Sequence, residues 1–397
     1  MSADPAGHDP VTAGSGASAD PVAFARSVFG ELAEVSAAQR DLFPRLPGPE
    51  LRAAARDVLG VLDLAAGDVR VERAWTDGDL AGEELSWSVG FGPRTRAYLL
   101  RPRGAAGPLP GVVALHCHSG MKWVGKEKIA DGPEGPSPEV RRLRSQIYGG
   151  RAYAAELARR GFVVLAHDVL CWGSRRFPLA AGGRAASEAD MHGTPGSSEA
   201  DTNGTPGLSE ADRYDLAAWE HEHEVAKHCA LLGTSFAGVV AGEDLAAAAY
   251  LRSRPDVTSV GCVGLSGGGL RAALLGAFDP QVRAVVVAAM VSTYRDLLGG
   301  YVGKHTWMLF PSGLPRLGDW PDLVASRAPA PLMVMYAVRD ELFPREGMRR
   351  AHEIVAGRYR DAPGRYEAVF ADAPHSFDVP MQERAFAWLE RHLRPAP

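Results

Sequence analysis

Apolar residues follow two alternating patterns along most of this chain. Short, nearly continuous apolar runs predict strands that are buried on both faces, and the segments between them place apolar residues at helical spacing. The runs are VVALHCH, FVVLAHD, SVGCVGL, VRAVVVAAM, PLMVMYAV and YEAVFAD, and the helical segments include residues 153–160, 239–253, 271–278, 348–358 and 382–393. This alternation predicts βαβ units, and therefore an α/β fold with a mostly parallel sheet and helices on both faces.

The N-terminal part of the chain has a different pattern. Residues 1–20 lack apolar periodicity and are expected to form a disordered tail. Two amphipathic segments (21–38 and 49–63) and three β-rich runs (69–75, 84–91 and 95–102) come next. We therefore predict a helical and β extension over residues 21–80 and a main domain over 81–397, with a central sheet of about eight strands.

Two long segments interrupt the alternation. Residues 174–230 contain two copies of an eleven-residue repeat, SEADMHGTPGS and SEADTNGTPGL, and a truncated SEAD at 209–212. Gly-Thr-Pro-Gly in each full copy forbids a continuous helix, so we predict a solvated, largely disordered surface insertion. Residues 290–329 are rich in aromatic side chains, which is typical of a cap over a pocket. The candidate pocket residues are Tyr301, His305, Trp307 and Phe310.

Composition restricts the partners and the compartment. The chain is 46% hydrophobic and 23% charged, with a net charge of −5, so nucleic acid and anionic membranes are poor partners. No apolar run is long enough to span a bilayer, and the first residues lack the features of a signal peptide. The scattered cysteines Cys117, Cys171, Cys229 and Cys262 are expected to be buried free thiols. We expect a cytoplasmic protein, and the sequence leaves open whether it forms a homodimer.

The segment VTSVGCVGLSGGGLRAAL (257–274) carries the most information about function. A β-branched run enters Gly-Leu-Ser-Gly-Gly, and a helical segment follows directly, which is the strand–turn–helix context of a nucleophile elbow. Glycines two residues before and two residues after the serine would let the strand and the helix approach closely. Ser266 is therefore the candidate nucleophile.

Two further residues complete a candidate triad. An elbow serine needs a histidine to take its proton, and the histidine needs a carboxylate to hold its tautomer. Asp340 follows the run PLMVMYAV, and His375 lies in the loop after YEAVFAD, in the chain order Ser, Asp, His. The rival acids, which fit this order less well, are Asp296, Glu341, Asp372 and Asp378.

Acyl transfer also needs donors for a developing oxyanion. The N–H of Gly267, which follows the nucleophile, is one expected donor. The second is expected from the loop after VVALHCHSG, from the N–H of either His118 or Cys117.

With these motifs in place, the chain resembles α/β-hydrolases of the acetyl xylan esterase and dienelactone hydrolase-like group over roughly residues 80–395. The matching segments are LHCHSGMKWVGKEKIADG, YAAELARRGFVVLAHDVLCWGSRR, AGEDLAAAAYLRSRPDV, GLSGGG, RDELFP and APHSF. The resemblance implies an α/β-hydrolase fold and a catalytic domain over 81–397. There are two departures. Cys117 stands where relatives often have the first glycine of His-Gly-x-Gly, and dienelactone hydrolases proper use a cysteine in place of Ser266.

Other clusters point away from metals and nucleotide cofactors. His223 and His228 lie about 140° apart around a helix and cannot share one ion, while His221 and His228 lie two turns apart. His116 and His118 alternate on or after a strand and point to opposite sides. There is no Gly-x-Gly-x-x-Gly after the first strand and no Walker lysine, so no cofactor is expected.

The sequence thus predicts a serine hydrolase that cleaves a carboxylic ester of a small to medium-sized organic substrate. One alternative is an acyl transferase, lyase or cyclase of a small-molecule pathway, in which the same site excludes water. A second is a peptidase or amidase, although the roughly 80 residues before the core cannot hold the propeller of prolyl-oligopeptidase relatives. A third, a binding module without activity, is disfavoured by a complete triad.

Overall fold

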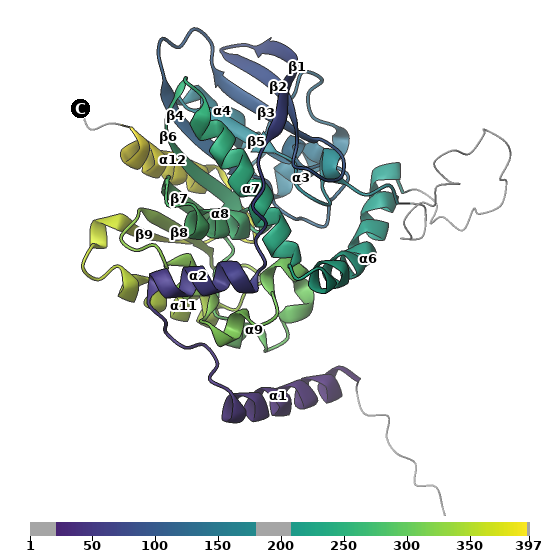
Figure 1. Ribbon diagram of the computed structural model, residues 1–397, viewed down its shortest axis with the longest axis vertical. Coiled ribbons are helices and arrows are strands. Elements are labelled where there is room, and N and C mark those ends of the chain that lie inside the picture. The colour runs from purple at the N-terminus through teal and green to yellow at the C-terminus, as the bar shows by residue number, and fades with distance from the viewer. Residues whose placement is uncertain (1–20, 180–207, 395–397) are drawn as a thin grey trace, which may run out of the picture.

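The computed structural model describes residues 21–179 and 208–394. A nine-stranded sheet crosses the body of the protein in the order β1-β2-β3-β5-β4-β6-β7-β8-β9 (Figure 1). β1, β2, β3 and β5 pair antiparallel at one edge, and the strands from β5 to β9 in this order pair parallel. The predicted α/β fold with a mostly parallel sheet is confirmed.

Each apolar run in the sequence forms a strand. The strands are β1 (Gly67–Asp77), β2 (Leu80–Ser88), β3 (Thr95–Pro102), β4 (Leu109–Leu115), β5 (Val163–His167), β6 (Val257–Leu265), β7 (Val282–Ala288), β8 (Leu332–Ala337) and β9 (Tyr366–Ala371). The sheet therefore has nine strands where about eight were expected. The boundary predicted at residue 80 falls within the β1–β2 hairpin, so β1 belongs to the same sheet as the main domain.

Helices cover both faces of the sheet because successive strand residues point to opposite sides. Val113 and Leu115 join the apolar core beneath α2, α7, α8 and α11, while Val112 and Ala114 join the core beneath α4 and α12. The helices are α1 (Pro21–Gln39), α2 (Gly48–Val58), α3 (Pro138–Ile147), α4 (Tyr153–Arg159), α6 (Glu210–Leu231), α7 (Phe236–Ser253), α8 (Gly267–Phe278), α9 (Tyr294–Leu297), α10 (Trp320–Val324), α11 (Arg345–Arg358) and α12 (Val379–Leu393). α1 stands apart from the body (Figure 1).

The insertion at 174–230 contains a helix that the sequence interpretation did not include. The two full copies of the repeat fall almost entirely outside the described residues, but the third SEAD begins α6. Ser209 accepts a hydrogen bond from the Asp212 amide, and the Asp212 carboxylate accepts one from the Ser209 amide. The expectation of a disordered repeat is therefore wrong for residues 209–212, because Ser-x-x-Asp before an apolar periodic run forms a capping box.

Among the described residues, no single helix is long and apolar enough to cross a membrane. α6 and α7 reach that length and composition only together, across a bend of 84°. The first thirteen or so residues of α7 are mostly buried in the core, which accounts for their apolar character.

Candidate active site

Ser266 lies on a strained turn between β6 and α8. Its φ of 57° and ψ of −124° are rare for a residue with a side chain. A Cβ at Gly264 would lie 2.2 Å from backbone atoms of Gly268, and one at Gly268 would lie 2.1 Å from the carbonyl oxygen of Leu115. Both positions therefore need glycine, since a side chain at Gly264 would push α8 away from β6 and one at Gly268 would push α8 away from β4 (Leu109–Leu115). The turn leaves Ser266 at the carboxyl end of a central strand and only partly buried.

Asp340 and His375 form a hydrogen-bonded pair at the same edge of the sheet. The Oδ2 atom of Asp340 lies 2.6 Å from Nδ1 of His375, and Leu342 donates its N–H to Oδ1 of Asp340 over 2.8 Å. The Asp340 side chain is fully buried, whereas that of His375 is 21% exposed. A histidine held through Nδ1 keeps Nε2 free for proton transfer. β6, β7, β8 and β9 are successive neighbours, so the loops that carry all three candidate residues meet at one edge.

The rival acids have other roles. Asp296 binds Arg350 and Thr293, and Asp372 binds Arg339. Asp378 caps α12 by accepting the N–H of Met381. Glu341 is exposed. Of the five acids considered from the sequence, the structure joins Asp340 to His375.

The loop after β4 brings the His118 amide against the elbow. A Cβ at Gly267 would lie 2.8 Å from the His118 nitrogen, which is closer than real Cβ contacts. Gly267 is the first residue of α8, so its own N–H has no partner within the helix. The sequence leaves His118 and Cys117 open as the second donor. Of these two residues, His118 is the one next to Gly267.

The Glu222 carboxylate on α6 fixes the side chain of His118. The Oε2 atom of Glu222 lies 2.8 Å from His118 Nε2 and 2.6 Å from Lys122 Nζ. Gly120 donates its N–H to His118 Nδ1 over 3.0 Å, so the proton of the neutral imidazole is on Nε2 and is donated to Glu222. Burial lowers the pKa of His118, which keeps the ring neutral.

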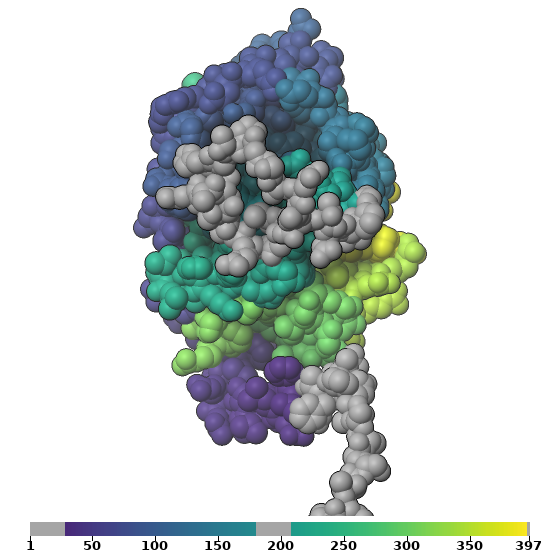
Figure 2. All heavy atoms as spheres, turned by 90° about the vertical axis from the view of Figure 1, so that its right-hand side faces the viewer, coloured from purple at the N-terminus to yellow at the C-terminus, as the bar shows by residue number. Residues whose placement is uncertain are grey.

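The second oxygen of Glu222 binds the 290–329 segment. Its Oε1 atom accepts hydrogen bonds from Thr306 Oγ1 (2.6 Å) and from the Trp307 amide (3.1 Å). Burial would raise the pKa of Glu222, but the neighbouring His118 and Lys122 outweigh it and hold the pKa far below its usual range. Figure 2 shows α6, in teal, directly beside the green 290–329 segment. Glu222 therefore joins the loop after β4 to this segment.

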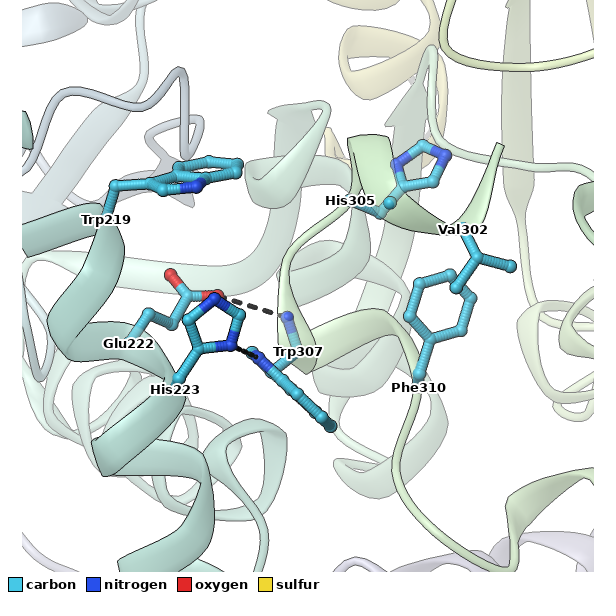
Figure 3. Close-up of a pocket in the computed structure, with 8 residues that line it drawn as sticks. Trp219, Glu222, His223, Val302, His305, Trp307 and Phe310 are labelled. Carbon is cyan, nitrogen blue, oxygen red and sulfur yellow. Dashed lines mark hydrogen bonds between the residues drawn. The ribbon is translucent and has the colours of Figure 1, made fainter. Parts of the chain in front are cut away.

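A pocket of about 300 Å³ lies between α6 and the 290–329 segment (Figure 3). Its wall is mostly apolar and aromatic. Trp307 donates its indole N–H to Nδ1 of His223 over 2.8 Å across this wall. The lining residues are Trp219, Glu222, His223, Val302, Gly303, His305, Trp307 and Phe310.

Ring contacts connect the pocket wall to both sides of the candidate site. The rings of Trp219 and His118 are 5.7 Å apart, which connects the pocket to the loop after β4. The His305 ring is 4.6 Å from Phe343, which in turn stacks near His375 at 6.4 Å. The pocket wall is therefore linked to the His118 loop directly and to His375 through Phe343.

Three of the four pocket residues singled out from the sequence line this pocket, namely His305, Trp307 and Phe310. Tyr301 is not among the lining residues, and its ring contacts Lys304 instead. Sequence reasoning missed the residues that α6 contributes. In the sequence, His221, His223 and His228 suggest at most a metal site, whereas in the structure Glu222 and His223 line the pocket.

Within the described ranges, no group of three His, Cys, Asp or Glu side chains is arranged to hold a metal ion. All four cysteines lie in these ranges, and each is buried and free of a disulfide.

Comparison with known proteins identifies the fold. No protein-family model matches the chain. A protein of Bacillus subtilis (strain 168) with the name "Putative hydrolase YtaP" is 23% identical over 302 residues, which cover 75% of this chain and 83% of that protein.

Solved esterase structures share the architecture. A crystal structure described as "a putative acetyl xylan esterase" from Bacteroides fragilis NCTC 9343 has a TM-score of 0.62 at 12% identity, over 89% of this chain and 82% of that one. Acetyl xylan esterase 1 from Thermoanaerobacterium sp. JW/SL YS485 has a TM-score of 0.52 at 16% identity, over 89% of this chain and 96% of that one. The chain therefore has the α/β-hydrolase fold, and its predicted resemblance to acetyl xylan esterases is confirmed at the level of the fold.

Proposed function

We propose that this protein is a serine hydrolase that cleaves a carboxylic ester through an acyl-enzyme on Ser266. The observation that carries the proposal is the Asp340–His375 hydrogen bond at the sheet edge where Ser266 occupies its strained turn. The esterases among the structural neighbours support a hydrolytic reaction on an ester, although they share only the fold with this chain.

In the proposed reaction, Nε2 of His375 takes the proton of the Ser266 hydroxyl while Oγ attacks the acyl carbon. Asp340 holds the imidazole with its Nδ1 proton toward the carboxylate and stabilises the imidazolium that forms. His375 then gives the proton to the leaving alkoxide, and the alcohol departs. Water, deprotonated by His375, attacks the acyl-enzyme, and release of the acid restores the Ser266 hydroxyl.

The developing negative charge needs preorganised donors. We assign them to the backbone N–H groups of Gly267 and His118, because a Cβ at Gly267 would lie only 2.8 Å from the His118 nitrogen. Cys117, the other candidate from the sequence, is less suitable, since the three atoms nearest to a Cβ at Gly267 all belong to His118. No metal or nucleotide is required by this reaction.

The pocket favours an ester with an apolar or cyclic group of moderate size. About 300 Å³ is at the lower end of the range for small-molecule sites, and the wall presents aromatic rings with few free polar groups. The Glu222 carboxylate already accepts four hydrogen bonds, so it offers little to a substrate cation.

A fluorophosphonate probe tests the proposal. Only an activated hydroxyl attacks phosphorus at neutral pH, so mass spectrometry should locate the label on Ser266 and on no other residue. Ser266→Ala should be neither labelled nor active on a panel of 4-nitrophenyl esters. Labelling elsewhere, or activity that survives in Ser266→Ala, would refute the assignment.

A further inference from the structure

Lys128 is a buried lysine with no acidic partner among the residues that the structure describes. It ends a short 3-10 helix, Lys126–Lys128, and is 0% exposed. The neighbouring buried lysines each bind a carboxylate: Lys122 binds Glu222, and Lys126 binds Asp168 and Glu127. For Lys128, no carboxylate oxygen among the described residues lies within 4.0 Å of Nζ. A buried charge without an opposite charge destabilises the fold, so the contacts that Lys128 makes instead need an explanation.

Those contacts are with the backbone of the loop after β4. Lys128 Nζ donates to the carbonyl oxygens of Cys117 (2.9 Å) and His118 (3.0 Å). Burial lowers the pKa of Lys128 to about 8, and nearby groups that include Cys117 and Asp215 partly oppose this effect. The ammonium thus replaces its hydration shell mainly with two successive peptide carbonyls.

The position of these carbonyls fixes the direction in which the neighbouring amide N–H groups point. In a trans peptide the N–H points opposite to the preceding C=O. Because Lys128 draws the carbonyls of Cys117 and His118 to one side, the N–H groups of His118 and Ser119 point to the other side. The His118 nitrogen is the one that meets Gly267.

The loop needs such support because its backbone is strained. Ser119 has a φ of 52°, which is unfavourable for a residue with a side chain. His116 Nδ1 lies 3.1 Å from the Cys117 oxygen, and Ser119 Oγ donates to the His118 oxygen over 2.8 Å. Each of these contacts holds a single carbonyl, whereas Lys128 bridges both.

We propose that Lys128 is a positioning residue for the oxyanion hole, which aims the His118 N–H at the oxyanion by binding the two carbonyls behind it. The inference rests on the proposed function and adds to it a group that does not touch the substrate. Its effect should appear mainly in kcat, because the negative charge on this oxygen develops in the transition state and is absent from the bound ester.

The test is Lys128→Met, which keeps the length of the side chain and removes the donor. With 4-nitrophenyl butyrate we expect kcat to fall by about 10–100-fold at a nearly unchanged KM, since an error of about 1 Å in the position of a catalytic group costs about that much. The affinity for phenylboronic acid, whose Ser266 adduct places an oxygen in the oxyanion hole, should fall with kcat. Lys128→Gln, shorter but still a donor, should retain part of both.

Lys126→Met is the matched control. It removes a neighbouring buried ammonium that contacts Asp168 and Glu127 but neither loop carbonyl. Its melting temperature should fall, while kcat and boronate affinity should stay within about twofold of wild type. If Lys128→Met and Lys128→Gln keep wild-type kcat and boronate affinity, or lose them only as much as Lys126→Met does, the positioning role is refuted. A wild-type protein that neither labels at Ser266 nor hydrolyses esters would instead refute the proposed function.

Discussion

Replacement of Glu222 by glutamine should destabilise the protein and damage the site together. The carboxylate is 5% exposed and accepts four hydrogen bonds, two of them from His118 and Lys122 on the same oxygen. A glutamine side chain has two orientations at this position. Its NH₂ group would face either the His118 and Lys122 donors or the Trp307 N–H. In both orientations the buried Lys122 ammonium loses its counter-ion.

The magnitude follows from these contacts. Removal of one partner of a buried ion pair costs about 3–5 kcal/mol, because the remaining charge stays desolvated and unpaired. The free energy of unfolding, measured by urea denaturation at pH 7, should fall by about that amount for Glu222→Gln. For the protein that remains folded, we expect a lower kcat and a higher KM, since Glu222 fixes both the His118 loop and Trp307.

Glu224→Gln provides the control on the same helix. Glu224 is exposed, and within the described part of the chain its one ion pair is a 4.0 Å contact with His221, so its substitution should change stability by no more than about 0.5 kcal/mol. The reasoning is refuted if Glu222→Gln and Glu224→Gln unfold at the same urea concentration with equal m-values. It is also refuted if Glu222→Gln loses stability while kcat and KM both stay unchanged.

Three other predictions address the triad, the pocket and acid stability. Asp340→Asn should keep its fold and lower kcat by about 10²–10⁴, because the wrong imidazole tautomer is favoured, whereas Asp296→Asn should have a much smaller effect; steady-state kinetics on one ester decides. Trp307→Ala and Phe310→Ala should raise KM for bulky esters more than for acetate esters, by about 1–3 kcal/mol of discrimination, and equal effects on both would mean that these rings only pack the cap. Burial lowers the pKa of three imidazoles in the folded state, so the unfolded chain binds more protons than the folded one. The free energy of unfolding should therefore fall as the pH drops below about 6.5, the ordinary imidazole pKa. Flat stability from pH 7 to 5 would contradict this. The imidazoles concerned are those of His116, His118 and His167.

The strands could be predicted because each one carries its own signal. The run TRAYLLRP and the observed β3 have the same bounds, and the other strands differ from their runs by a few residues at the ends. The relation between Asp340 and His375 could also be predicted, because residues that follow parallel strands meet at one edge of the sheet. The predicted number of strands is one too low, because the run at 69–75, which forms β1, was assigned to the N-terminal extension and not to the central sheet.

The pocket shows where sequence reasoning ends. Glu222 and Thr306 are 84 residues apart in the chain, and no local pattern in either segment indicates that they meet. The position of α6 depends on how the insertion returns to the body, which is a property of tertiary packing. The Ser-x-x-Asp pattern at 209–212 does predict a capping box. It is hard to recognise, because the same four residues also begin each copy of the eleven-residue repeat.

The shared role of Glu222 also bears on how this enzyme could be redesigned. Its carboxylate forms part of the pocket wall and at the same time holds the loop that supplies the proposed oxyanion donor. Most substitutions on the α6 side of the pocket would therefore lower turnover. Selection from a library that varies this side would recover variants with restored turnover before variants that accept new substrates. Val302 and Phe310 line the opposite part of the wall, and mutagenesis there could change the accepted substrate while the Glu222 hydrogen bonds stay intact.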